Sequence, residues 1–337
     1  MYRIVKIFFL LISVFFLALA MYFFIGSPPI KKNITWGVDF SQMQAENLGL
    51  DWKKTYLAIL DDLGAKNIKL HIQWDWVEGE RDEFFFNDID WQINQAQKYK
   101  AKLIYVLGMK TGRWPECHLP EWFNGLSKQE QQEELLEYIQ EVVLRYKNQD
   151  TIMYWQAENE PLFRFGECPW YDKDFLKKEV QLIKSLDPLR QVIVSDSGEL
   201  SPWIGVSSIG DVVGVTMYRR VWTRITDGYG FYWTSIFPPV SYFKKAELVG
   251  KLTGKKVICV ELQVEPWALK PFFDVSLEEQ EKTMNLTQFR KNIEFARKTG
   301  LDEFYLWGVE WQYWLKEKHN KPEIWNEAKK LFGDSNY

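Results

Sequence analysis

The sequence predicts a single (β/α)8 barrel, the TIM-barrel fold, preceded by an apolar N-terminal helix. Short apolar runs alternate with longer stretches of helical spacing from residue 34 onward, and eight such units in about 300 residues are typical of this barrel. The apolar runs are continuous, as expected for parallel strands that are buried on both faces. No glycine-rich phosphate loop follows the first run, which disfavours a doubly wound open sheet.

The N-terminal segment, residues 7–26, carries no charge. About 20 apolar residues suffice to cross a bilayer as a helix, so we expect a transmembrane signal anchor behind a short basic arm, residues 1–6. A cleaved signal peptide is the alternative, because Ala18-Leu19-Ala20 has the small-x-small form of a cleavage site. The apolar run continues to Ile25, which favours the uncleaved anchor.

Residues 27–33 form a linker in this scheme, and residues 34–337 form the barrel domain. We expect the barrel outside the cytoplasm, either anchored to the membrane or secreted if the N-terminal segment is cleaved. The net charge of −4 and the absence of a long basic run argue against a nucleic-acid partner. No clustered His and Cys spacing indicates a metal, and we expect no cofactor. The sequence leaves the oligomeric state open.

The barrel elements follow in order along the chain. The eight predicted strands are residues 34–40, 67–74, 102–108, 151–161, 191–196, 210–218, 256–261 and 301–308. The helical stretches between and after them include residues 51–65, 88–101, 171–186, 244–254 and 322–332. Two further helices begin at capping-box spacings, Ser127 with Glu130 and Ser276 with Glu279, and the second is expected to end at Thr299-Gly300.

The active site of such a barrel lies at the carboxyl ends of its strands. Polar and aromatic residues end most of the predicted strands, in chain order Asp39, His71, Gln73, Trp74, Lys110, Arg113, Asn159, Glu160, Tyr218, Glu261, Gln263, Trp307 and Glu310. Glu160 ends the fourth strand and Glu261 ends the seventh. These two strands face each other obliquely across the mouth of the predicted barrel.

These residues carry a resemblance. Asn159-Glu160-Pro161 at the fourth strand, Glu261 at the seventh, Tyr218 at the sixth and Trp307 at the eighth resemble the glycoside hydrolase clan A, the "4/7" barrels. The stretch WVEGERDEFFFNDIDWQI, residues 76–93, also resembles a segment of these enzymes. Cellulase-like family 5 or a near relative is the nearest family, although Lys69 stands where family 5 usually has arginine.

The resemblance implies a retaining β-glycosidase that acts on an oligosaccharide or polysaccharide by double displacement. It implies Glu160 as acid/base, Glu261 as nucleophile and Asn159 as donor to the sugar 2-hydroxyl. Tyr218 would hydrogen-bond the nucleophile, and Trp307 would form a floor for the sugar. The remaining candidate substrate-binding residues are Gln263, Trp267, Trp74, His71 and Asp39.

Several alternatives stay open. Glu265 competes with Glu261, although it lies beyond the predicted strand end. A carbohydrate-binding barrel without activity is the alternative function, and a transglycosylase could use the same residues. The sequence names neither the sugar nor endo or exo action. Cys117 and Cys168 lie in loops after strands and can form a disulfide if the loops are neighbours.

Overall fold

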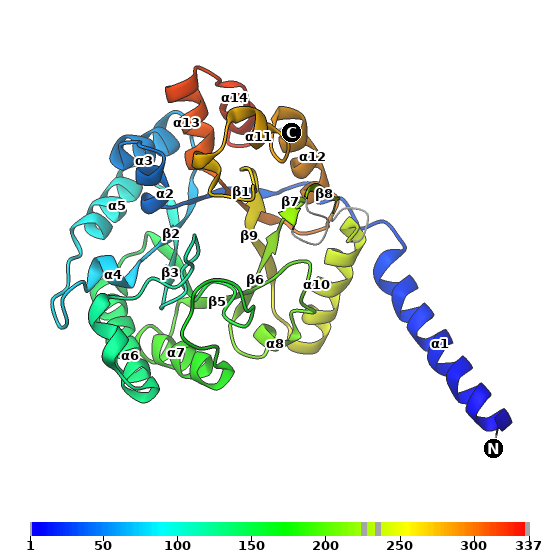
Figure 1. Cartoon of the computed structure of the whole chain (residues 1–337). Helices are drawn as coiled ribbons and strands as arrows, with labels where there is room; N and C mark the ends of the chain where they lie inside the picture. The colour runs from blue at the N-terminus through cyan, green and yellow to red at the C-terminus, as the bar shows by residue number, and fades with distance from the viewer. Residues whose placement is uncertain (1, 224–227, 233–236, 334–337) are drawn as a thin grey trace.

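A computed structural model describes residues 2–223, 228–232 and 237–333. Eight parallel strands close into a barrel in the order β1–β10–β9–β6–β5–β4–β3–β2, which confirms the predicted fold (Figure 1). The strands are β1 Thr35–Phe40, β2 Asn67–His71, β3 Lys102–Leu107, β4 Ile152–Ala157, β5 Gln191–Asp196, β6 Val212–Met217, β9 Val257–Gln263 and β10 Glu303–Trp307. Each overlaps the apolar run that predicted it.

The helices form a ring around the barrel (Figure 1). The longer ones are α3 Trp52–Asp61, α5 Asn87–Lys98, α6 Lys128–Tyr146, α7 Lys173–Leu186, α10 Pro239–Thr253, α12 Leu286–Arg297 and α13 Val309–His319. The shorter ones are α2 Gln42–Asn47, α4 Trp74–Val77, α8 Ile204–Ser207, α11 Leu277–Glu281 and α14 Glu323–Lys329, with 3-10 turns at Glu121–Gly125 and Phe272–Asp274.

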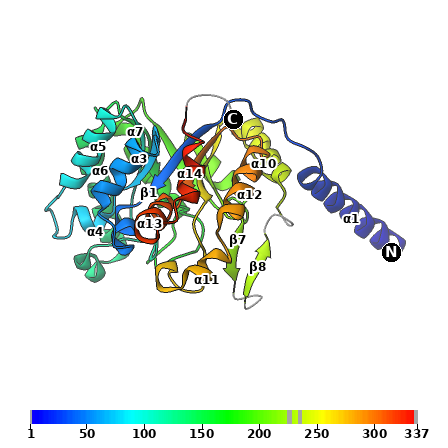
Figure 2. The same cartoon turned by 90° about the horizontal axis from the view of Figure 1, so that it is seen from above.

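The elements that escape the sequence prediction include a two-stranded hairpin and the helix α13. Strands β7 Arg220–Thr223 and β8 Gly228–Tyr232 pair as an antiparallel hairpin, which projects beyond the barrel in Figure 2. Helix α13 follows β10 directly and buries the polar residues Glu310 and Gln312, so it lacks the apolar stripe that marks a surface helix.

The helix expected between Ser276 and Gly300 is wrong in one respect, because the structure divides it into α11 and α12. Asn285 has an extended backbone, and its side chain accepts a hydrogen bond from the amide of Gln288 at 3.0 Å. This cap starts a new helix. The predicted capping box of α6, by contrast, is present at Ser127 and Glu130.

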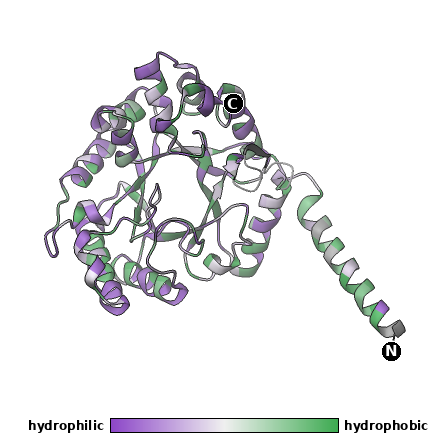
Figure 3. Cartoon of the chain, in the orientation of Figure 1, coloured by the Kyte–Doolittle hydropathy of each residue, from purple (hydrophilic) through white to green (hydrophobic). Residues whose placement is uncertain are grey.

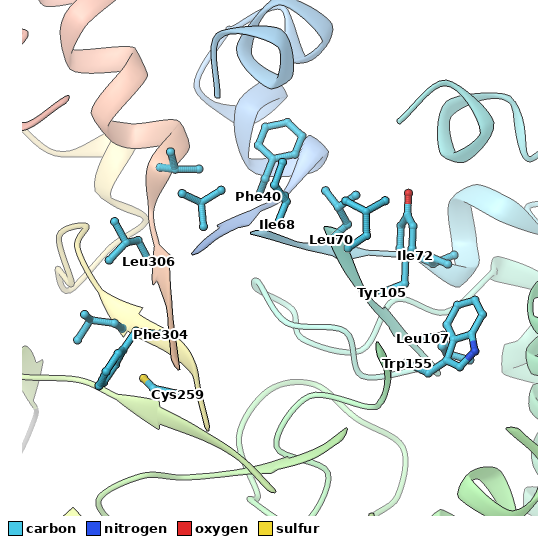
Figure 4. Close-up of a cluster of buried hydrophobic side chains, with 14 of the residues drawn as sticks. Phe40, Ile68, Leu70, Ile72, Tyr105, Leu107, Trp155, Cys259, Phe304 and Leu306 are labelled. Carbon is cyan, nitrogen blue, oxygen red and sulfur yellow. The ribbon is translucent and has the colours of Figure 1, made fainter. Parts of the chain in front are cut away.

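The core has two parts. The larger cluster lies between strands and helices, and Figure 4 shows a portion of it in which Leu70, Tyr105 and Trp155 project from β2, β3 and β4. The smaller cluster consists of strand residues alone and therefore fills the barrel interior: Ile104, Ile193, Val212, Ile258, Val260 and Tyr305. The two clusters use alternate residues of the same strands, as the two-residue period of a strand requires.

The apolar helix α1, Tyr2–Phe24, stands apart from the barrel. Its stretch Val5–Phe24 has 20 residues and a mean hydropathy of 2.7, and none of this stretch is buried. Figure 3 shows it apolar over most of its length, whereas the barrel helices mix polar and apolar faces. Its last turn touches α10, where the Tyr22 hydroxyl donates to Glu247 at 3.3 Å.

Candidate active site

A bulge in β9 aims Glu261 into the barrel mouth. Val215 of β6 pairs with Cys259, but the next residue, Thr216, pairs with Glu261, so β9 carries one extra residue. The pairing with β10 shows the same extra residue. Without it, strand alternation would place Glu261 on the outer face together with Cys259, which packs in the outer core. The extra residue re-aims the carboxyl inward.

Glu261 is buried between a cation and a hydroxyl. The Lys69 ammonium lies 3.0 Å from one carboxyl oxygen, and the Tyr218 hydroxyl donates to the other at 2.8 Å. Glu261 is 2 % exposed and Lys69 is fully buried. Coulomb attraction at this distance is strong because little water screens it, so the ammonium stabilises negative charge on Glu261.

Lys69 also binds Asp39, which extends the network across three strands. Its ammonium lies 2.8 Å from Asp39, and Asp39 contacts the His71 ring at 2.6 Å. Burial by itself would lower the pKa of Lys69, but the two carboxylates raise it above its usual value. Burial would likewise raise the pKa of Asp39, yet His71 and Lys69 bring it below its usual value. The ions are thus held charged in the interior.

Glu160 occupies a different environment on the other side of the mouth. Burial raises its pKa to about 8, and the negative charge of Glu261 adds to the shift. The Thr216 hydroxyl donates to one of its carboxyl oxygens at 3.0 Å. At neutral pH this carboxyl is therefore mostly protonated and can donate a proton.

The turn that carries Glu160 is strained and tightly held. Glu158 and Glu160 have φ angles of 60° and 45°, in a left-handed region that costs about 1–3 kcal/mol for each such residue. The buried Glu158 carboxylate accepts hydrogen bonds from the amides of Met109 at 2.9 Å and Lys110 at 2.5 Å. Gly108 leaves room for it, because a Cβ there would lie 2.4 Å from a Glu158 oxygen. These contacts over-determine the turn.

Asn159 is oriented by its neighbours with its amide group free. Its side-chain oxygen accepts hydrogen bonds from Gln156 at 3.2 Å and from the Ser195 hydroxyl at 3.5 Å. Ser195 also accepts a hydrogen bond from the Glu160 amide at 2.8 Å. The Asn159 nitrogen has no partner in the described part of the chain and is not sealed from solvent. It can donate to a ligand.

Comparisons with known proteins relate the sequence and the fold to glycoside hydrolases. Residues 34–201 match the sequence model of glycosyl hydrolase family 10. The fold is similar to an endo-beta-1,4-mannanase from Thermotoga petrophila, with 16 % identity, 90 % of this chain and 78 % of that chain covered, and a TM-score of 0.59. It is also similar to xylanase 10B from Thermotoga maritima, with 16 % identity, coverage of 89 % and 95 %, and a TM-score of 0.59. No curated protein matches the chain by sequence.

The chain is a clan A glycoside hydrolase. It is a retaining enzyme that cleaves β-glycosidic bonds. The resemblance to family 5 is not supported, because the family model that matches is that of family 10.

Four of the predicted substrate-binding residues of this hydrolase are engaged by other groups of the protein. Trp74 is fully buried in the core, stacked on Tyr138 with ring centroids 5.2 Å apart. Gln263 is also fully buried, and its side chain binds the main chain of Arg219, Arg220 and Glu265. Asp39 and His71 are committed to the Lys69 network and to the carbonyl of Thr111. Asp39 and His71 therefore hold Lys69, which in turn contacts Glu261.

Trp307 and Trp267 both lie beside other groups of the site. The Arg113 guanidinium lies 3.8 Å from the Trp307 ring centroid and also binds Glu265 and Glu310. Trp307 is only 5 % exposed, which leaves little of its indole for a sugar. Trp267 is half-buried, with its ring 5.1 Å from that of Tyr218.

The sequence prediction missed Thr216 and gave Lys69 no role in the site, whereas Arg113 was among the residues expected at the strand ends. Only Lys69 left a signal, because a lysine inside an apolar strand needs a buried counter-charge. The structure also joins Cys117 to Cys168 in a disulfide with a Cα–Cα distance of 5.3 Å. This bond ties the loop after β3 to the loop after β4. A pocket of about 320 Å³ formed by residues of α11–α14 lies elsewhere and contains neither carboxyl.

Replacement of Lys69 by methionine is expected to destabilise the barrel by about 3–5 kcal/mol, because it leaves two buried carboxylates without their cation. Urea denaturation at pH 7 with the disulfide intact measures the change. Lys66→Met is the matched control, because Lys66 is exposed and lies directly before β2. It should change the stability by less than about 0.5 kcal/mol. Equal stabilities of the two variants would contradict the structural role given to Lys69.

Proposed function

We propose that this hydrolase uses Glu160 as its acid/base and Glu261 as its nucleophile. The observation that carries the proposal is the contrast between their environments: burial raises the pKa of Glu160 to about 8, whereas Lys69 and Tyr218 hydrogen-bond Glu261 and stabilise its charge. Retention requires one carboxylic acid and one carboxylate at the same pH.

In the first step, Glu261 attacks the anomeric carbon while Glu160 gives its proton to the leaving oxygen. The product is a covalent glycosyl-enzyme. In the second step, the Glu160 carboxylate takes a proton from water, which attacks the same carbon and releases the sugar with retained configuration. The free amide of Asn159 would donate to the 2-hydroxyl of the reacting sugar, a contact that strengthens in the transition state. Tyr218 keeps Glu261 aimed.

The similar structures guide the choice of substrate. They include endo-beta-1,4-mannanases and xylanases, among them a GH10 endoxylanase from a sugarcane soil metagenome with 15 % identity, coverage of 89 % and 97 %, and a TM-score of 0.60. We therefore propose a β-1,4-linked polysaccharide of the xylan or mannan type as substrate and family 10 as the family. The match to family 10 over residues 34–201 supports this assignment.

Replacing either carboxyl group should slow catalysis strongly, and the products formed with added azide should show the role of each group. Glu160→Ala and Glu261→Ala are each expected to lower kcat by about 10²–10⁴-fold or more. Sodium azide can take the place of the missing side chain. It should restore turnover of 2,4-dinitrophenyl β-glycosides, with an α-glycosyl azide from the Glu261 variant and a β-glycosyl azide from the Glu160 variant.

Nuclear magnetic resonance of the azide products identifies the anomers. Glu265→Ala serves as the control, because Glu265 competes for the role of nucleophile. An α-glycosyl azide from the Glu265 variant, with full activity of the Glu261 variant, would transfer the role to Glu265.

The pH dependence should report the acid. Glu160 acts in its protonated form, so kcat/KM is expected to fall as the pH rises through about 8, the value to which burial raises its pKa. Initial rates between pH 5 and pH 10 measure this limb. In Glu160→Gln, assayed with a 2,4-dinitrophenyl leaving group that needs no proton, the limb should disappear. If the limb stays in that variant, another group is the acid.

We also propose that residues 7–26 anchor the enzyme in a membrane with the barrel outside the cytoplasm. The apolar length of α1 supports a span, and the disulfide between Cys117 and Cys168 suits an oxidising compartment. The full chain should remain in the membrane fraction after a wash at pH 11, whereas a chain that begins at Ile34 should be soluble. Release of the full chain as a soluble barrel that lacks residues 1–26 would favour a cleaved signal peptide instead.

A further inference from the structure

The loop that follows β3, residues 110–118, is fixed against the mouth of the barrel. A bridge pairs Lys110 with Cys117, and the His118 amide donates to the carbonyl of Met109 at 2.9 Å. The disulfide to Cys168 holds the loop to the segment that follows Glu160. The loop is therefore a rigid wall of the site, and the residues at its tip have defined positions.

Glu116, next to Cys117 on the returning arm of this loop, has a carboxyl group that binds no other group within the described residues. It is 8 % exposed, yet no hydrogen bond or ion pair engages its carboxyl within the described residues, and its oxygens are not sealed from solvent. The charges of Lys110, Glu261 and Arg113 all act on it, and its own charge acts on Glu160. It is a third carboxyl beside the two proposed catalytic groups.

This placement is unfavourable for the folded protein by itself. Glu116 has a φ angle of 78°, a left-handed backbone that costs about 1–3 kcal/mol in a residue other than glycine. Burial raises its pKa to about 7 against the opposing charge of Lys110. Gly166 packs so closely that a Cβ there would lie 2.5 Å from the Glu116 Cβ, which fixes the direction of the side chain. Strain and an unpartnered polar group of this kind are typical of a binding site.

We propose that Glu116 is a substrate-binding residue whose carboxyl oxygens accept hydrogen bonds from hydroxyl groups of the sugar held between Glu160 and Glu261. The proposal deepens the proposed function and rests on it. Two oxygens of one carboxylate can accept from hydroxyls on adjacent ring carbons, so Glu116 selects for the configuration of those carbons.

The charges around Glu116 favour a neutral sugar over a cationic amino sugar. The charges of three cations act on it. Each cation is held by other groups: Lys110 by the carbonyls of Glu160 and Phe163 at 3.1 and 2.9 Å, Lys69 by two carboxylates, and Arg113 by two others. The carboxyl therefore lacks hydrogen-bond donors rather than positive charge. Sugar hydroxyls supply donors without adding charge.

The test measures kcat/KM of the full chain on the 4-nitrophenyl β-glycosides of xylose, glucose, mannose and galactose, and on the monodeoxy analogues of the fastest of them. In the wild type, removal of one or two specific hydroxyls should lower kcat/KM by about 10- to 100-fold, since hydrogen bonds to a charged group have this strength. Glu116→Ala should lower kcat/KM on the intact sugar by a similar factor. In this variant, removal of the same hydroxyls from the sugar should lower kcat/KM by less than about twofold further.

Two further variants complete the set. Glu116→Gln keeps the shape of the side chain. Glu167→Gln changes an exposed carboxyl group in the loop on the other side of the disulfide. Glu116→Gln should reproduce part of the loss, and Glu167→Gln should match the wild type. A purely structural role would lower the rate on every analogue by the same factor and leave the pattern of deoxy losses unchanged. That unchanged pattern would overturn the proposal.

Covalent labelling separates this outcome from a failure of the proposed function. A 2,4-dinitrophenyl 2-deoxy-2-fluoro-β-glycoside should label Glu261 in both the wild type and Glu116→Ala, as mass spectrometry of peptides can show. Labelling of Glu261 with unchanged deoxy losses overturns the role of Glu116 alone. Labelling of a different residue in the wild type overturns the assignment of the nucleophile, and the inference on Glu116 fails with it.

Discussion

The site depends on one buried cation. Lys69 is fully enclosed in the barrel, 2.8 Å from Asp39 and 3.0 Å from Glu261, and burial of an ammonium without counter-charges would cost several kcal/mol. The carboxylates offset that cost, and the ammonium in turn holds negative charge on Glu261 without help from water. The negative charge then acts across the mouth and helps to raise the pKa of Glu160. Lys69 thus stabilises the charge of Glu261 directly, while burial is the main cause of the raised pKa of Glu160.

The backbone around Glu160 and the loop after β3 give this network its geometry. Left-handed residues occur at Arg113, Glu116, Glu158 and Glu160, all in the two loops that the disulfide joins. Such residues persist only where the surroundings over-determine them. Three features hold these two loops in place: the buried Glu158 carboxylate, the Lys110 ammonium and the disulfide. Half of the eight non-glycine residues with positive φ in the described chain therefore lie in the two loops beside Glu160.

Arg113 gives the mouth a feature that the predicted sugar floor does not have. Its guanidinium, from the loop after β3, binds Glu265 in the loop after β9 and Glu310 in α13. The same guanidinium lies over the ring of Trp307. The aromatic surface expected for sugar stacking is therefore largely occupied by a guanidinium. In the proposed function, hydrogen bonds from Asn159 and to Glu116, rather than a flat apolar floor, hold the reacting sugar.

The sequence by itself determined the barrel and the positions of Glu160 and Glu261 at the ends of its fourth and seventh strands. Continuous apolar runs and helical spacing are local properties, so they could be read along the chain. The sequence missed α13, because its buried face includes Glu310 and Gln312 and no local pattern reveals their partners. The sequence prediction also placed Trp74 and Gln263 near the substrate, although both are fully buried. The sequence alone does not show which side chains at the end of a strand are buried in the core.

The tertiary structure alone decided which way the side chains point and which charges meet. The bulge that turns Glu261 inward is a matter of register between β9 and its two neighbours, and the contacts of Lys69 join residues 30 and 192 positions away in the chain. Both depend on how the strands close into a cylinder. Local sequence carries the period of each element, but register, burial and long-range ion pairs exist only after the elements have packed together.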